Sequence, residues 1–359
     1  MAAPPAQRRG SEARPRRFLP ELFLQLHVTD HCDLTCAHCY MTRRETTHLS
    51  QDLFARALEQ FQALCRAMPH ARHWVQITGG EPLLHPQIGD LLRFARERVG
   101  TVKIMTNGLS LSDEFVRVIA GTCRAAQVSL DGLPPTHDRL RGVGTFRGAL
   151  AGVERLRRAG VFTSVKMTVS RANQQDILPL FEAVRESVDL FSISRLVPSG
   201  PEQADLLPEP QRYAQALDAL NRIAEGDRRI SQRDPWCGPY LARHRAARHF
   251  RGCSAGLNGL TVLETGEILP CRRLPIVIGH LQTTALLGAM RGPVARALRA
   301  RRFEPPCGHC RWLRHCGGSR CIAYALTGRL GAADPDCPYF ETFPAHTTGG
   351  GDHGPAASA

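Results

Sequence analysis

The sequence of 359 residues has almost no lysine, no long apolar run and no apolar stretch behind its N-terminal arginines. Lys103 and Lys166 are its two lysines, so arginine supplies nearly all the basic charge behind the formal net charge of +13. The arginines are spread along the chain without interleaved aromatic residues, which indicates a genome-composition bias and excludes nucleic acid as the expected partner. No run of 18 apolar residues exists, so we expect no membrane span and no membrane partner.

The cysteine count is odd, at 13, and the arginine-rich start lacks the apolar stretch of a secretory signal. Together these features predict a reducing compartment, the cytoplasm, where clustered cysteines indicate metal ligands before disulfides. Cys65 falls within a predicted helix and Cys123 just before a predicted strand. Because both stand apart from the clusters, we expect them to be small core residues.

The first half of the chain alternates apolar strand patterns with amphipathic helical patterns. This alternation predicts parallel βαβ units, and hence an α/β fold that is either an open partial barrel or a doubly wound sheet. The predicted strands are 22–28, 73–77, 101–105, 126–130, 162–169 and 190–194. The predicted helices are 50–66, 86–98, 112–120, 145–159 and 173–186.

Polar and glycine-rich clusters follow each predicted strand, including Thr78 to Pro82 and Thr106 to Gly108. The carboxyl ends of parallel strands meet at one edge of a sheet or barrel, where such folds build their active sites. Asp131 and Arg195 also fall at this edge. We expect them near the barrel mouth, in a capping or pairing role.

Composition divides the chain into five parts. We predict a disordered basic tail at 1–20, the α/β core at 21–200, a linker region at 201–230 with a helix at 211–226, a domain rich in Cys, Gly and Pro at 231–342, and a disordered tail at 343–359. So many cysteines among so few periodic segments indicate that the fourth part folds around metal.

Cys32, Cys36 and Cys39 form a C-x3-C-x2-C pattern in the loop after the first strand. Three cysteines in eight residues can hold a 4Fe–4S cluster but cannot fill its four positions, which leaves one iron open to a small molecule. A tetrahedral zinc site prefers paired C-x2-C hooks and fits less well.

This cysteine spacing, with Gly79-Gly80-Glu81-Pro82 after the second strand, resembles the radical S-adenosylmethionine (SAM) superfamily. The resemblance implies a partial (β/α)6 barrel, a 4Fe–4S cluster on the three cysteines and SAM on its open iron. It places the SAM amino group at Gly79, Gly80 and Glu81, where a carboxylate and backbone carbonyls accept from an ammonium group. By position it adds Asn107, Ser129 and His38, the last standing where the family usually has an aromatic residue.

The resemblance implies an enzyme that reductively cleaves SAM to a 5′-deoxyadenosyl radical, with the electron supplied by a reductant such as flavodoxin or ferredoxin. The cofactor carries the difficult chemistry, and the protein supplies position and excludes water. A non-catalytic iron–sulfur electron carrier is the alternative from another class. Such a carrier needs no pocket for SAM, so the Gly79-Gly80-Glu81 sequence favours the enzyme.

The later cysteines resemble the SPASM extension of the same superfamily, which binds two auxiliary iron–sulfur clusters. The last short spacing, Cys316 to Cys321, has four intervening residues where the family usually has three. The resemblance assigns one auxiliary cluster to Cys307, Cys310, Cys316 and Cys337, and three ligands of the other to Cys253, Cys271 and Cys321. Cys237 is a candidate for the missing ligand, which could also be a residue other than cysteine. Two zinc ribbons remain the alternative for the whole set.

Enzymes with this layout modify peptides, activate sulfatases or act on haem precursors. Arg272 and Arg273 follow Cys271, where sulfatase activators usually have an aspartate, and an arginine pair suits an acidic substrate. We therefore expect first a maturase that forms a carbon–carbon or carbon–sulfur bond in a ribosomally made precursor peptide, and second a tetrapyrrole or haem-biosynthesis enzyme. We expect no winged-helix module before residue 21, so a leader peptide, if one is bound, would be held by a separate leader-binding protein or by the edge of the sheet.

Overall fold

The computed structural model describes residues 21–41, 45–231, 233–244, 250 and 252–339. The predicted tails, 1–20 and 343–359, lie outside the described residues. Within the described part, ten strands form one sheet in the order β10-β9-β8-β1-β2-β3-β4-β5-β6-β7. The strands are β1 (Glu21–His27), β2 (Arg72–Thr78), β3 (Val102–Thr106), β4 (Ala125–Ser129), β5 (Phe162–Val169), β6 (Leu190–Arg195), β7 (Ile230–Ser231), β8 (Gly259–Val262), β9 (Glu267–Leu269) and β10 (Gly279–His280).

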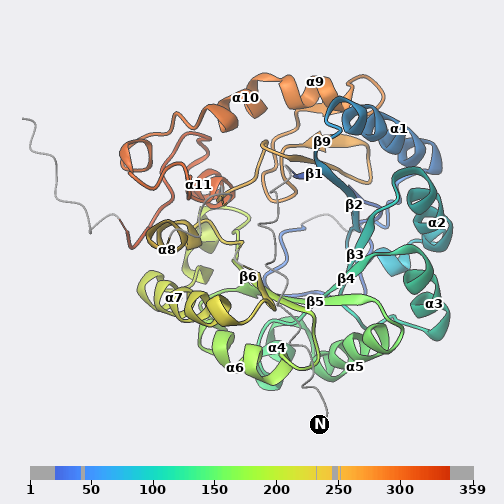
Figure 1. Ribbon diagram of the computed structural model, residues 1–359, viewed down its shortest axis with the longest axis horizontal. Helices are drawn as coiled ribbons and strands as arrows, with labels where there is room; N and C mark the ends of the chain where they lie inside the picture. The colour runs from blue at the N-terminus through green and yellow to red at the C-terminus, as the bar shows by residue number, and fades with distance from the viewer. Residues whose placement is uncertain (1–20, 42–44, 232, 245–249, 251, 340–359) are drawn as a thin grey trace, which may run out of the picture.

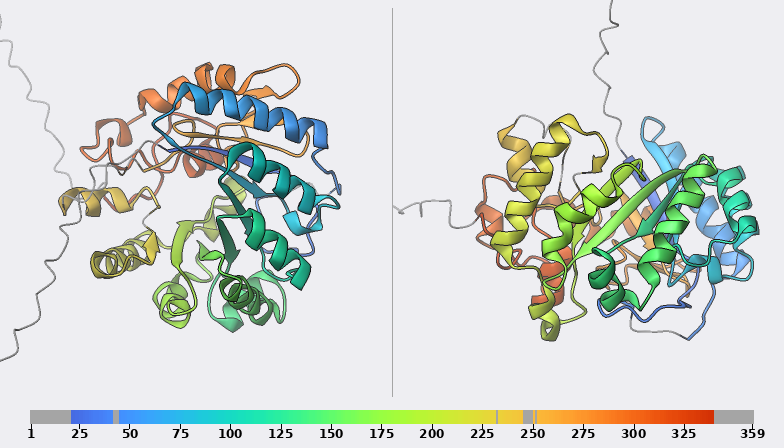
Figure 2. Two further views of the ribbon diagram at one scale, coloured as in Figure 1. Left: turned by 45° about the vertical axis from the view of Figure 1, so that its right-hand side comes forward. Right: turned by 90° about the horizontal axis from the view of Figure 1, so that it is seen from below.

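Helices surround the outside of this curved sheet, as the two further views also show (Figures 1 and 2). The helices are α1 (Gln51–Ala67), α2 (Ile88–Val99), α3 (Asp113–Thr122), α4 (Pro134–Arg141), α5 (Thr145–Arg158), α6 (Ile177–Val184), α7 (Pro210–Gly226), α8 (Cys237–Arg243), α9 (Leu286–Arg291), α10 (Pro293–Ala300) and α11 (Arg320–Thr327). The strands from β8 through β1 to β7 run parallel, whereas β9 pairs antiparallel with both β8 and β10. The predicted partial (β/α)6 barrel is therefore confirmed.

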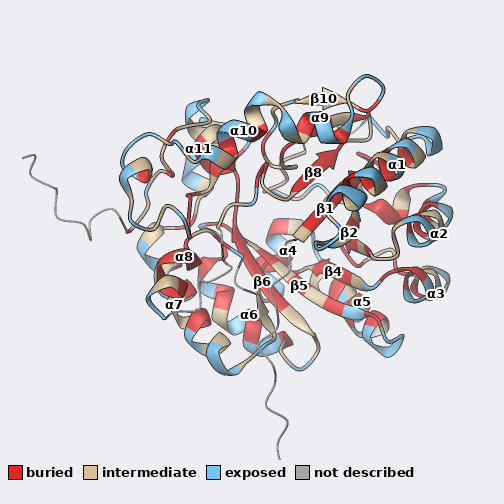
Figure 3. Ribbon diagram, turned by 45° about the horizontal axis from the view of Figure 1, so that its top comes forward, coloured by how far each residue is buried: buried red, intermediate tan, exposed pale blue. Residues whose placement is uncertain are grey.

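The two faces of each strand have different surroundings because successive side chains point to opposite sides of a sheet. In β5, Val165, Met167 and Val169 are fully buried in the core beneath the helices. The alternate residues Lys166 and Thr168 line a cavity on the concave side. Figure 3 shows the same division across the molecule, with burial concentrated on the strands and the inner helix faces. The concave side of the barrel is thus free for a ligand.

Local signals explain where most helices begin. The Ser50 side chain accepts a hydrogen bond from the Leu53 backbone N–H, and Ser112 caps α3 in the same way. The predicted helix 173–186 is shorter in the structure: a single 3-10 turn covers Gln174–Asp176, and α6 covers Ile177–Val184. Helix α4 was not predicted, because its start, Pro134-Pro135, also fits a loop.

The cysteine-rich region contributes to the sheet, which its composition did not indicate. Strand β8 pairs in parallel with β1, with Phe23 opposite Gly259. The Phe23 ring occupies the space over Gly259, where a Cβ atom would lie 2.4 Å from it. The outer edge of β1 is thereby covered, and the region is attached directly to the barrel beside the first cysteine loop.

Candidate active site

The loop after β1 brings three cysteines to the mouth of the barrel. Cys32, Cys36 and Cys39, called the SAM set below, are half-buried and line one cavity of about 150 Å³. The carboxylate of Asp30 anchors the loop by accepting hydrogen bonds from the backbone N–H groups of Glu45 and Thr47, at 2.9 and 2.7 Å. The three thiols thus share the concave space that the barrel leaves free.

Gly79 and Gly80 let the end of β2 lie directly against this loop. A Cβ atom on Gly79 would be 2.3 Å from the Thr29 carbonyl oxygen, and one on Gly80 would be 2.3 Å from that of His31. The Gly80 N–H donates to the Thr29 carbonyl at 2.7 Å, and the next N–H donates to that of His31. Both glycines also line the cavity. Glycine is required here because two backbone segments approach more closely than any side chain allows.

Glu81 is fully buried behind the cavity wall. Its carboxylate accepts hydrogen bonds from the Thr106 hydroxyl at 2.8 Å, the Asn107 N–H at 2.7 Å and the Leu83 N–H at 3.2 Å. Burial raises the pKa of Glu81 to about 7, although these bonds oppose the shift. Glu81 therefore ties the end of β2 to the end of β3. Its contact with the amino group of SAM stays a prediction.

The other residues expected to contact SAM are near the three cysteines. Asn107 and Ser129 line the cavity, and the Asn107 side chain donates to Asp33 at 2.6 Å. His38 also lines it, but its Nε2 bonds the carboxylate of Asp131 at 2.9 Å. Among the described residues its Nδ1 has no hydrogen-bond partner. The structure thus brings these predicted residues to one cavity, and their contacts with SAM stay predictions.

Asp131 forms an ion pair with Arg141, a residue that lines the cavity. It lies 2.5 Å from Nε of Arg141, and Nη1 of Arg141 is in turn 3.9 Å from the sulfur of Cys36. Burial would raise the pKa of Asp131, but Arg141 and His38 hold it well below its usual range. The expected pairing role of Asp131 is confirmed. Its partner Arg141, on helix α4, places a positive charge near the sulfur of Cys36.

Besides Arg141, three more cations line the same cavity. Lys166 enters from β5, while Arg272 and Arg273 follow Cys271. Burial, together with the charges of Arg273 and Arg272, lowers the pKa of Lys166 to about 7. The arginine pair was predicted from the sequence to suit an acidic substrate, whereas Lys166 was not predicted as a site residue. The alternating pattern of the predicted strand 162–169 could have indicated that Lys166 points inward.

Four cysteines of the C-terminal region, called the outer set, line a second and smaller cavity. They are Cys307, Cys310, Cys316 and Cys337, as the resemblance implied. The backbone N–H of Asp334 donates to the Cys307 sulfur, and that of Gly318 to the Cys316 sulfur, both at 3.3 Å. Backbone donors aimed at sulfur favour the thiolate form, which is the form that binds iron.

Cys253, Cys271 and Cys321, called the inner set, lie together in a separate small apolar cluster. The sulfurs of Cys271 and Cys321 are 3.8 Å apart. The hydrogen bond between them lowers the pKa of Cys271 and, together with burial, raises that of Cys321. The set adjoins the SAM cavity through Arg272 and Arg273.

Cys237 does not join the inner set. It begins α8 and is buried in the main apolar core, whereas the inner set belongs to the smaller cluster. Burial raises the pKa of Cys237 far above its usual value, and its thiol bonds Asn221 on α7. This placement argues against its candidacy as fourth ligand. Cys123 is also buried, as expected, and Cys65 is half-buried on α1.

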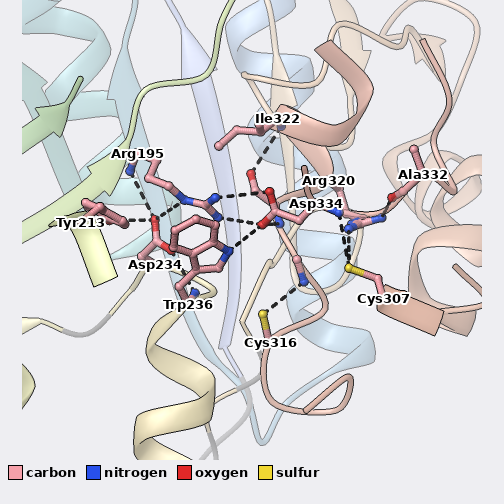
Figure 4. A network of polar contacts seen from close by, with 12 residues as sticks. Arg195, Tyr213, Asp234, Trp236, Cys307, Cys316, Arg320, Ile322, Ala332 and Asp334 are labelled. Atoms are coloured by element: carbon pink, nitrogen blue, oxygen red, sulfur yellow. Dashed lines mark hydrogen bonds and ion pairs between the residues drawn. The ribbon is translucent and has the colours of Figure 1, made fainter. Parts of the chain in front are cut away.

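A buried ionic network joins the barrel to the cysteine-rich region (Figure 4). Arg195, at the end of β6, contacts Asp234 at 3.4 Å and Asp334 at 2.8 Å. Tyr213 donates to Asp234, and Trp236 donates to Asp334. The expected pairing role of Arg195 is confirmed. Because Asp334 also lines the outer cavity, the network fixes that cavity relative to the barrel.

The donor chemistry of the three sets fits iron–sulfur clusters. Thiolates are the usual ligands of 4Fe–4S clusters, and the SAM set provides three with a glycine-lined space beside them. In the described part of the chain, no three His, Cys, Asp or Glu side chains converge closely enough for a single metal ion. Fold and site together define an iron–sulfur enzyme that binds SAM inside a partial barrel.

Comparison with known proteins agrees. A model of the Radical SAM superfamily matches residues 26–184, and one of the SPASM iron–sulfur cluster-binding domain matches residues 253–311. The chain is therefore a radical SAM enzyme with a C-terminal SPASM domain. It binds a 4Fe–4S cluster with SAM and auxiliary clusters in the SPASM domain. None of the described helices is both long and apolar enough to cross a membrane.

Two relatives illustrate the range of the family. The AdoMet-dependent heme synthase of Methanosarcina barkeri is 26% identical over 338 residues, which cover 87% of this chain and 95% of that protein. The mycofactocin maturase MftC of Mycobacterium ulcerans is 28% identical over 334 residues, covering 88% and 87%. One of the two relatives is thus named as a heme synthase and the other as a maturase.

Solved structures share the fold. Streptococcus suis SuiB bound to S-adenosylmethionine superposes with a TM-score of 0.68 at 19% identity, covering 89% of this chain and 77% of that one. The structure of anSMEcpe with bound AdoMet gives 0.71 at 14% identity, covering 88% and 90%. At such low identity the likeness concerns the fold alone.

Proposed function

We propose that this enzyme uses SAM for radical chemistry on a tetrapyrrole that carries several carboxylates, as in haem biosynthesis. The observation that supports this proposal is the cationic wall formed by Lys166, Arg272 and Arg273 inside the SAM cavity. Cations in a water-poor site bind carboxylates strongly, and arginine does so with two parallel hydrogen bonds. The heme synthase relative, which this chain matches over nearly its whole length, supports the same class.

The chain's own residues have distinct tasks in this proposal. When bound, the cluster and SAM supply a radical able to take a hydrogen atom from an unactivated carbon. Gly79 and Gly80 leave room for SAM beside the SAM set, and Asn107 and Ser129 provide polar groups along its wall. The cationic wall orients the substrate carboxylates. A small reductant protein supplies the electron.

A direct test is to reconstitute the full chain anaerobically with iron and sulfide, then add SAM, dithionite and an iron porphyrin bearing propionate side chains. We expect the porphyrin to accelerate formation of 5′-deoxyadenosine and to change in mass. The tetrapyrrole class would be contradicted if 5′-deoxyadenosine formed at the same rate with and without the porphyrin and the mass of the porphyrin did not change. SAM cleavage itself would still be established by that result.

The second candidate function is maturation of a ribosomally made precursor peptide, which the sequence analysis placed first. The maturase relative supports it, and SuiB, whose fold this chain shares, has been solved with its precursor peptide SuiA. An acidic residue of a peptide would bind the same cationic wall. In the same assay, acceleration by an acidic peptide and not by the porphyrin would select this candidate, and a leader-binding protein would then be sought.

A further inference from the structure

Arg320 carries a permanent charge but is almost completely buried, at 2% exposed. It is the first residue of α11 and the last of the four residues between Cys316 and Cys321. Its Nη1 donates to the Ala332 carbonyl at 2.6 Å, and its guanidinium stacks 4.0 Å from the centre of the Phe303 ring. Among the described residues its Nε has no hydrogen-bond partner.

In the described part of the chain, no carboxylate forms an ion pair with this guanidinium. The nearby carboxylate is Asp334, whose oxygens already bind Arg195, the Trp236 indole N–H and the Ser319 N–H. Figure 4 shows Arg195 on one side of Asp334 and Arg320 on the other. A buried cation without a counter-charge is strongly unfavourable. Because the Asp334 oxygens are engaged by these other donors, no described carboxylate contacts the Arg320 guanidinium directly.

The group that faces this charge is sulfur. Nη2 of Arg320 points to the Cys307 sulfur at 3.9 Å, and its backbone N–H bonds the Cys253 sulfur. Gly318 makes the approach possible, because a Cβ atom there would lie 2.4 Å from Nη2 and 3.3 Å from the Cys307 sulfur. Arg320 thus lies between the outer and inner sets, with its charge directed at the outer one.

We propose that Arg320 is the counter-charge of the outer auxiliary cluster and raises the reduction potential of that cluster. A 4Fe–4S core with four thiolates carries about −2 when oxidised and about −3 when reduced. A fixed positive charge in a low-dielectric interior stabilises the more negative state more, so it favours reduction. The inference rests on the auxiliary cluster and is independent of the substrate.

The test is a redox titration followed by electron paramagnetic resonance. It uses the full chain in which Cys32, Cys36 and Cys39 are alanine, so that the signals come from the auxiliary clusters. Arg320→Met keeps length and apolar contact with Phe303 but removes the charge, whereas Arg320→Lys keeps it. Arg329→Met is the matched control, because Arg329 is exposed and pairs with Glu304.

We expect Arg320→Met to lower the potential of the outer cluster, decreasing its reduced-to-oxidised ratio at fixed potential by about tenfold, or about 59 mV. Arg320→Lys should shift it much less, and Arg329→Met not at all. An unchanged potential in fully loaded Arg320→Met would overturn the proposal.

If Arg320→Met cannot retain the outer cluster, Arg320→Lys decides. Retained iron with a potential near that of the parent supports a charge role. Loss of iron from this variant too would mean that arginine's shape matters and not its charge, and would overturn the proposal as well.

Discussion

The SAM set and the outer set each have an arginine near a cysteine sulfur, half-buried in the first case and buried in the second, but the two arginines differ in their carboxylate partners. Arg141 lies 3.9 Å from Cys36 and is paired with Asp131. Arg320 lies 3.9 Å from Cys307 and, among the described residues, has no carboxylate ion pair. A cluster on three thiolates carries about −1 and one on four carries about −2. The site with the less negative cluster is thus the one whose arginine is already neutralised.

The largest effect should come from removing one site completely. Replacing Cys32, Cys36 and Cys39 with alanine should abolish SAM cleavage, because no ligand set remains for the cluster that binds SAM. About four irons should be lost per chain, while the absorbance of the auxiliary clusters persists. Cys65→Ala, on the half-buried α1 cysteine, is the matched control and should cleave SAM normally. Cleavage by the triple variant would show that the SAM set is misassigned.

The two sites also depend on different glycines. A Cβ atom on Gly80 would lie 2.3 Å from the His31 carbonyl oxygen and 2.7 Å from that of Asp30, so Gly80→Ala must displace the loop of the SAM set. We expect a loss of SAM cleavage of about 100-fold, the usual cost of misplacing reacting groups by about 1 Å. Deoxyadenosine assays measure it.

Gly318→Ala should damage the outer set and leave the SAM set intact. Gly318 has a left-handed backbone conformation, and a Cβ atom there would disturb Arg320 and Cys307. We expect loss of outer-cluster iron while the SAM set keeps its cluster. Gly121→Ala, with open space around it on α3, is the control for both. If Gly80→Ala and Gly318→Ala damaged the same cluster, the two sites would not be independent.

Much of this architecture follows from local patterns in the sequence. The predicted strands agree with β1 to β6 within one residue at each end, and the three cysteine sets follow from spacing and resemblance. The pairing of β8 with β1 could not be predicted, because a four-residue strand has too short an apolar pattern and its partner lies over 200 residues away. The burial of Glu81 and of Cys237 depends on tertiary contacts, which spacing alone does not encode. The position of Lys166 in the cavity could be predicted in part, since strand alternation limits its side chain to one of two faces.

Asp131→Asn should make the SAM site resemble the outer one by leaving Arg141 without its carboxylate. Because a buried ion pair loses one partner, we expect unfolding free energy to fall by about 3–5 kcal/mol. The cluster of the SAM set should also become easier to reduce. Chemical denaturation of the loaded protein and redox titration measure the two effects.

The control is Asp113→Asn, whose exposed pair with Arg155 contributes at most about 1 kcal/mol. Because the pKa of Asp131 is lowered by folding, its contribution is present at neutral pH and lost in acid, below the unfolded value of about 3.9. Equal losses in the two variants would mean that burial does not distinguish these pairs.

Lys166 is a second cation that, in the described part of the chain, forms no carboxylate ion pair, but it faces the SAM cavity and not a cysteine. By analogy with Arg320, we expect the counter-charge of Lys166 to be a carboxylate of the substrate. Lys166→Met should weaken binding of the carboxylate-bearing substrate by about tenfold, the loss of one charge-assisted hydrogen bond. SAM cleavage without substrate should be unchanged. Equilibrium binding by fluorescence or calorimetry measures the difference.

The pH dependence of this binding has a definite sign. Burial and the charges of Arg273, Arg272 and Arg233 lower the pKa of Lys166 to about 7, although the charge of Asp234 opposes them. Below pH 7 the amine is charged and binds a carboxylate, whereas above it the free enzyme must first take up a proton. Affinity should therefore weaken as pH rises from 7, and Lys166→Met should remove this slope. Thr168→Val, at the next inward position of β5, is the control that should keep it. A slope that persists in Lys166→Met would assign the titration to another group and leave the cationic wall to the two arginines.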